Sequence, residues 1–65
     1  MRSKDRIKPF LDELATLWGD EFQDWRFGQL MLNFMSWLHS EKGIKDIFFL
    51  EENRFIELFR EFAGR

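Results

Sequence analysis

Residues 25–41 read WRFGQLMLNFMSWLHSE and have the spacing of an amphipathic helix that is unusually rich in apolar side chains. One stripe at helical spacing consists of Phe27, Leu30, Met31, Phe34 and Leu38. Four further apolar residues, Trp25, Leu32, Met35 and Trp37, lie largely off that stripe. A helix that is apolar around most of its circumference is central in its domain or is covered on a second side by a partner. The segment is therefore predicted to be the central helix of a small bundle.

Two weaker amphipathic segments flank this one. Residues 5–18 carry apolar side chains three and four apart, and Gly19 is expected to end that helix. Asp24 is a suitable N-cap for the helix over 25–41, and Gly43 is a suitable terminator. A last helix is predicted over 51–62, and the aromatic connector Ile47–Phe49 before it is expected to plug the core. The predicted fold is all-α, a small three-helix orthogonal bundle with helices at about 5–18, 25–41 and 51–62.

The composition limits the fold to one domain, residues 1–65. A chain of 65 residues with nine Phe and three Trp can form a dense aromatic core, and Trp18, Leu30 and Phe34 are predicted to belong to it. With no Cys and no apolar run long enough to cross a membrane, a cytoplasmic location without membrane association is expected. Residues 1–4 are predicted to be a basic, frayed arm.

Electrostatics argue against a dedicated nucleic-acid binder. The formal net charge is −2, and acidic and basic residues are mixed everywhere except in the first eight positions. The basic arm, which contains Arg2, Lys4, Arg6 and Lys8, could touch phosphates. More often such an arm is simply solvated, so a nucleic-acid partner is not expected.

A motif in the centre of the chain runs from Trp18 through Asp24-Trp25-Arg26-Phe27-Gly28-Gln29-Leu30 to Asn33. It resembles a family of small bacterial and phage proteins of unknown function, which share a Trp followed by Pro-Asp-x-Arg-Phe/Leu-Gly-Gln-Leu-x-x-Asn. The resemblance covers nearly the whole chain and departs at Gln23, where the family tends to have Pro. It implies a compact helical domain and implies no activity.

The polar members of this motif have two interpretations. Arg26, Gln29 and Asn33 are spaced three and four apart, so they line one side of the helix and could bind a protein or a nucleic acid. Alternatively, Arg26 pairs with Asp20 or Glu21, and the two amides bond to loop backbone. Gly28, which weakens a helix, is expected to allow close approach of the first helix.

No set of residues has the spacing of a catalytic, cofactor or metal site, so the chain is predicted not to be an enzyme. His39 lies one turn from Ser36, but no oxyanion motif accompanies the pair. Asp20 and Asp24 flank a loop without a third ligand for a cation.

The leading functional hypothesis is a small protein-binding or regulatory module that acts through an apolar helix surface. The candidate interaction residues are Trp25, Leu32, Met35 and Trp37, and a homodimer is the simplest associated state because one patch can serve both subunits. The other hypothesis is a weak nucleic-acid-binding protein that uses the basic N-terminal arm.

Overall fold

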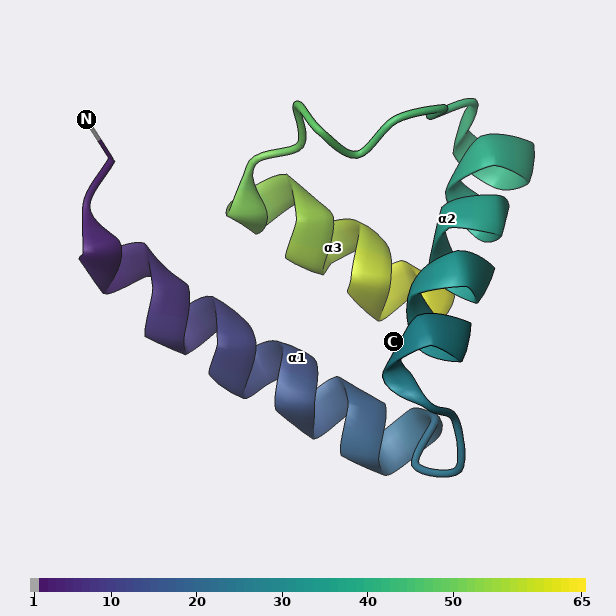
Figure 1. Ribbon diagram of the computed structural model, residues 1–65, viewed down its shortest axis with the longest axis horizontal. Helices are drawn as coiled ribbons and strands as arrows, with labels where there is room; N and C mark the ends of the chain where they lie inside the picture. The colour runs from purple at the N-terminus through teal and green to yellow at the C-terminus, as the bar shows by residue number, and fades with distance from the viewer. Residues whose placement is uncertain (1) are drawn as a thin grey trace.

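A computed structural model describes residues 2–65, which form three α-helices and a short 3₁₀ turn without any strand (Figure 1). The turn η1 (Lys4–Arg6) leads directly into α1 (Ile7–Glu21). The helices α2 (Phe27–Lys42) and α3 (Glu52–Phe62) follow. The predicted all-α three-helix bundle is confirmed.

The central helix is α3 rather than α2. In Figure 1, α1 and α2 diverge from their short connection, and α3 packs against both of them. Phe55 of α3 illustrates this position, because its ring centroid lies 5.3 Å from that of Phe10 in α1 and 5.0 Å from that of Phe34 in α2. The sequence prediction was wrong here because the additional apolar residues of α2 do not all meet another helix.

The core is built mainly by α2 and α3. Its fully buried or nearly buried side chains come from all three helices: Leu17, Leu30, Phe34, Leu38, Ile56, Leu58 and Phe59. The ring of Phe34 lies 5.0 Å from that of Phe59 and 5.4 Å from that of Phe62, in edge-on or tilted geometries that aromatic pairs favour. Leu30 and Phe34 are thus confirmed as core residues, whereas Trp18 is half-buried at its edge.

Two helix boundaries differ from the predictions. Gly19 does not end the first helix, which continues to Glu21 and closes with a 2.9 Å bond from the Phe22 N–H to the Trp18 carbonyl. The second helix begins at Phe27, and the Gln29 side chain accepts a 2.8 Å hydrogen bond from the Arg26 N–H. The N-cap is therefore Arg26, and the prediction of Asp24 was wrong; the bond to Gln29 satisfies the N–H of this N-cap residue.

The prediction for Gly43 is confirmed. It ends α2 in the left-handed conformation with φ of 67°, a conformation that glycine adopts without a steric penalty.

The connector between α2 and α3 differs from the prediction at two positions. Ile47 is half-buried and packs against the core, as expected. Phe48 and Phe49, however, are 79% and 82% exposed. A 3.0 Å bond from the Leu50 N–H to the Ile47 carbonyl closes a turn, and both phenylalanines occupy its corner. Since Ile47 and Leu50 both pack inward, the corner between them projects outward.

The basic arm is attached to the start of α3 through ion pairs. Arg2 pairs with Glu51 at 2.6 Å, and Arg6 pairs with Glu52 at 2.5 Å. Ser3 has an extended backbone, and its side chain accepts a bond from the Asp5 N–H at the start of η1. Residue 1 of the predicted arm lies outside the described residues.

Within residues 2–65, none of the helices combines the length and the apolar character needed to cross a membrane.

Candidate functional site

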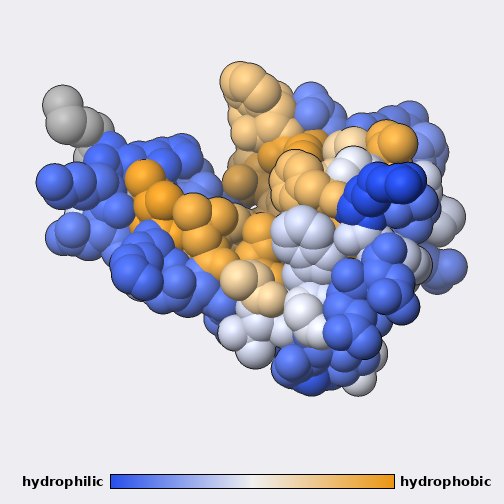
Figure 2. Space-filling model, turned by 60° about the horizontal axis from the view of Figure 1, so that its bottom comes forward, coloured by the Kyte–Doolittle hydropathy of each residue, from blue (hydrophilic) through white to orange (hydrophobic). Residues whose placement is uncertain are grey.

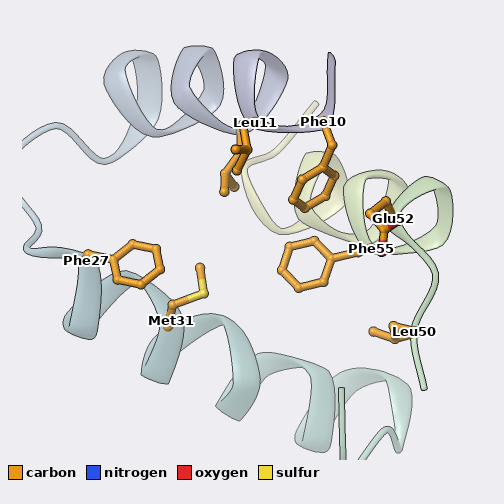
Figure 3. Close-up of a pocket in the computed structure, with 8 residues that line it drawn as sticks. Phe10, Leu11, Phe27, Met31, Leu50, Glu52 and Phe55 are labelled. Carbon is orange, nitrogen blue, oxygen red and sulfur yellow. The ribbon is translucent and has the colours of Figure 1, made fainter. Parts of the chain in front are cut away.

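An apolar groove lies between α1 and α2, with α3 behind it (Figures 2 and 3). Its volume is about 350 Å³. The residues that line this α1–α2 groove are Phe10, Leu11, Leu14, Phe27, Met31, Leu50, Glu52 and Phe55. Figure 2 shows apolar side chains on both sides of the hollow, so a visiting apolar group would be shielded from water on several sides.

The wall formed by α1 exists because the apolar face of this helix is wider than its contact with α3. Phe10 packs against Phe55 at the back, with ring centroids 5.3 Å apart. Leu11, the next residue, is rotated by about 100° around the helix axis and remains 51% exposed. Figure 3 shows the Leu11 side chain directed from α1 toward the cavity.

The opposite wall comes from the first turns of α2. Phe27 and Met31 lie one turn apart and point into the groove (Figure 3). The Phe27 ring lies 5.8 Å from the Trp18 ring, so these two residues close the end of the groove where the helices converge. Phe27 is nevertheless 54% exposed, so part of this residue remains in contact with solvent.

The third wall is the start of α3 and the residue before it. Leu50 and Phe55 are half-buried, and Phe55 forms the back of the cavity. Of the described residues that line the groove, Glu52 is the one that carries a charge, and Arg6 balances this charge through their 2.5 Å contact. The groove therefore favours apolar groups over ions.

The four predicted interaction residues do not form a single exposed face. Trp25 is half-buried and stacks on Phe22 with centroids 4.6 Å apart. Trp37 is also half-buried; its ring lies 5.5 Å from that of Phe62, and the Lys42 ammonium lies 5.7 Å from its centroid. Leu32, at 64% exposure, and Met35 do lie on the surface of α2. A role for these residues in association stays a prediction.

The three polar residues of the motif also differ in their surroundings. Gln29 has the structural role described above, at the N-terminus of α2. Arg26 and Asn33 are exposed. Asp20 and Glu21, the expected partners of Arg26, instead pair with Arg65, at 3.0 Å each.

Gly28 has no packing role within the described chain. Among residues 2–65, no atom outside its local helical surroundings would lie within 4 Å of a Cβ at this position. The expectation that it admits the first helix was therefore wrong, because no atom of α1 lies within 4 Å of a Cβ at this position.

The titratable residues show one clear electrostatic effect near the helix interfaces. Arg60 of α3 donates to Glu13 of α1, and this hydrogen bond lowers the pKa of the Glu13 carboxyl below its ordinary value of 4.5. Ser36 and His39, the pair considered for catalysis, are both exposed. Among residues 2–65, no three His, Asp or Glu side chains gather as metal ligands would.

Sequence reasoning missed the groove because its residues have ordinary core spacing. Phe10, Leu11 and Leu14 belong to the stripe of the first helix, and Phe27 and Met31 to that of the second. A signal was present in the first stripe, which spans both Phe10 and Leu11 and is wider than one helix neighbour can cover. Nothing in the pattern specified that α1 and α2 diverge.

Comparisons of the chain with protein-family models, with curated proteins and with solved structures give no match. The resemblance of the Trp18–Asn33 motif to small bacterial and phage proteins accordingly stays a prediction.

Proposed function

We propose that this chain is a protein-binding module that holds apolar side chains of its partner in the α1–α2 groove. The observation that carries the proposal is the groove itself: a hollow of about 350 Å³ whose described lining is apolar except for Glu52. Apolar grooves between helices are a common site for the apolar face of an amphipathic segment. The proposed role is regulatory or structural and requires no catalytic residue, and its expected location is the cytoplasm.

The lining provides both anchoring surface and rigidity. Leu11 and Phe27 are half-exposed, so covering them would remove apolar surface from water on binding. Phe55 is fixed behind them by its contacts with Phe10 and Phe34. A preorganised apolar pocket of this kind loses little conformational entropy when a partner binds.

Nucleic-acid binding receives less support from the same contacts. Three of the four arm cations are already paired: Arg2 with Glu51, Arg6 with Glu52 and Lys8 with Asp12. A phosphate would have to compete with these carboxylates in a chain of net charge −2.

The proposal is tested by site-specific photocrosslinking in the source cell. Benzoylphenylalanine is placed at Leu11, inside the groove, and in a matched control at Thr16, an exposed residue on another face of α1. We expect protein adducts from position 11 and few or none from position 16. The adducts should also disappear when Phe27→Ser is added, because that change removes the opposite wall. Equal labelling from both positions would contradict a role for the groove.

A further inference from the structure

The connector contains a second apolar feature, formed by Phe48 and Phe49, which we call the aromatic turn. It is held in place on both sides: the Phe48 N–H donates to the Asp46 carboxylate at 2.9 Å, and the Leu50 N–H donates to the Ile47 carbonyl at 3.0 Å. Ile47 and Leu50 pack against the core at either end. The turn is therefore a fixed projection of the domain.

The residues at the corner of this turn are unusual for their position. Turn corners ordinarily hold Gly, Pro, Asn, Asp or Ser, which suit the backbone and tolerate water. Here two phenylalanines stand with ring centroids 4.8 Å apart, each about four-fifths exposed. Adjacent exposed aromatic rings on a rigid support resemble the anchor residues of protein interfaces, which are already ordered before binding.

The aromatic turn and the α1–α2 groove are neighbours on one surface. Leu50, which follows Phe49 directly, is a lining residue of the groove. The molecule thus presents an apolar projection and an apolar hollow side by side. Two copies related by a two-fold axis beside Leu50 could each insert the projection into the hollow of the other, and such an arrangement closes on itself.

We propose that the occupant of the groove is the aromatic turn of a second copy of this chain. The inference rests on the proposed function and names its partner. It accounts for both the aromatic turn and the groove, because each would bury apolar surface of the other that is exposed to water in the monomer.

The available area is consistent with a dimer. Phe48 and Phe49, with the exposed parts of Leu11 and Phe27, present roughly 500 Å² of apolar surface. A standard interface buries about 800 Å² on each partner. The paired turns and grooves supply more than half of this, and the polar rim around them supplies the remainder.

Charge near the turn favours a protein occupant over a membrane. The charged residues around it are Lys45, Asp46, Glu51 and Glu52. Arg2 and Arg6 balance the two glutamates, so this neighbourhood has no excess of positive charge. Segments that bind an anionic bilayer carry an excess of Lys and Arg, which is lacking here, whereas the largely apolar groove requires no such excess.

The first test is sedimentation equilibrium on the parent chain and on two variants. The double variant Phe48→Ser with Phe49→Ser removes the projection, and Leu11→Glu places a charge in the groove. We expect the parent to dimerise at tens of micromolar or below, and each variant to weaken the dimer by roughly 30-fold or more. Helicity by circular dichroism should be unchanged, because all three side chains are half-exposed or more. The matched control is Leu32→Glu, an exposed apolar residue of α2 outside the groove, which should dimerise like the parent.

A second test uses the absence of cysteine from the sequence. Two single-cysteine variants, Phe49→Cys and Leu11→Cys, are mixed and oxidised, and the 49–11 disulfide is quantified. We expect it to form faster than the 49–32 disulfide in a matched mixture with Leu32→Cys. Equal rates would overturn the proposed register.

Other outcomes identify other occupants and overturn the inference. A parent that stays monomeric at hundreds of micromolar excludes the second copy, while cross-links from position 11 to a different protein would leave the proposed function intact. A dimer that is lost in Leu32→Glu but kept without the aromatic turn would assign association to the outer face of α2. Binding of the monomer to phosphatidylcholine–phosphatidylglycerol vesicles through the turn would assign it to a membrane.

Discussion

Phe27 and Phe34 lie two turns apart on the same stripe of α2, yet their surroundings differ completely. Phe34 is fully buried against Phe55, Phe59 and Phe62 of α3. Phe27 touches Trp18 but otherwise faces the open groove. The two positions follow the same helical period, so the period alone did not decide which of them is core.

The difference lies in the third helix. α3 crosses α2 where Phe34 and Leu38 lie, and it covers that part of the stripe. At the start of α2 the neighbour is α1, which diverges from it (Figure 1). An apolar stripe becomes core only where another element covers it, and where none does, it becomes a surface available for binding.

The largest loss of stability is expected from a substitution in the part of the α2 stripe that α3 covers. Phe34→Ala removes a fully buried ring at the centre of the core, and should lower the free energy of unfolding by about 3–5 kcal/mol. For a domain of this size that is most of the stability available. Urea unfolding followed by circular dichroism measures it. A variant as stable as the parent would show that α3 does not pack on α2 as described.

A substitution in the part of the α2 stripe that faces the groove should lower stability much less. Phe27→Ala removes a half-exposed ring, so we expect a loss of about 1 kcal/mol in the same urea titration. Its larger effect should fall on the protein contacts of the groove. A loss equal to that of Phe34→Ala would mean that the groove is closed in solution.

Substitutions of the two glycines near the ends of α2 should change the free energy of unfolding by smaller amounts and in opposite directions. Gly28→Ala places a Cβ in open space within the helix and should stabilise the fold by about 0.5–1 kcal/mol. Gly43→Ala forces alanine into a backbone with φ of 67° and should destabilise it by about 1 kcal/mol. Paired thermal melts test both signs. Destabilisation by Gly28→Ala would reveal a close neighbour at the start of α2.

The smallest change in stability is expected from the ion pair between Glu13 of α1 and Arg60 of α3. Because the pKa of Glu13 is lowered in the folded state, its contribution to stability is present above its ordinary value of 4.5. That contribution is lost as the pH falls through the lower, folded-state pKa. Glu13→Gln should therefore be slightly less stable than the parent at pH 7, and the difference should shrink by pH 3.

Urea titrations at the two pH values measure this change. Glu57→Gln, which breaks the exposed pair with Arg54 on α3 itself, serves as the control for a contact within one helix. A difference between parent and Glu13→Gln that grows in acid would contradict the sign of the shift.

The amino-acid sequence determined the local features of this protein. The apolar period and the polar intervals predicted three helices, and they placed Leu30 and Phe34 in the core. Gly43 identified the end of α2, because only a residue without a Cβ adopts its left-handed conformation freely. The positions of the helices and of the glycine terminator each depend on a few consecutive residues, so one sequence contains enough information to predict them.

Only the tertiary structure decided which apolar residues are covered. The central place of α3, the divergence of α1 from α2 and the outward direction of Phe48 and Phe49 were not predicted. They depend on how segments far apart in the chain cross one another. Apolar side chains gain free energy from burial against any neighbour, whichever segment provides it. The hydrophobic pattern therefore predicts which side chains gain free energy from burial. The packing of the three helices determines which of them are buried within the chain itself.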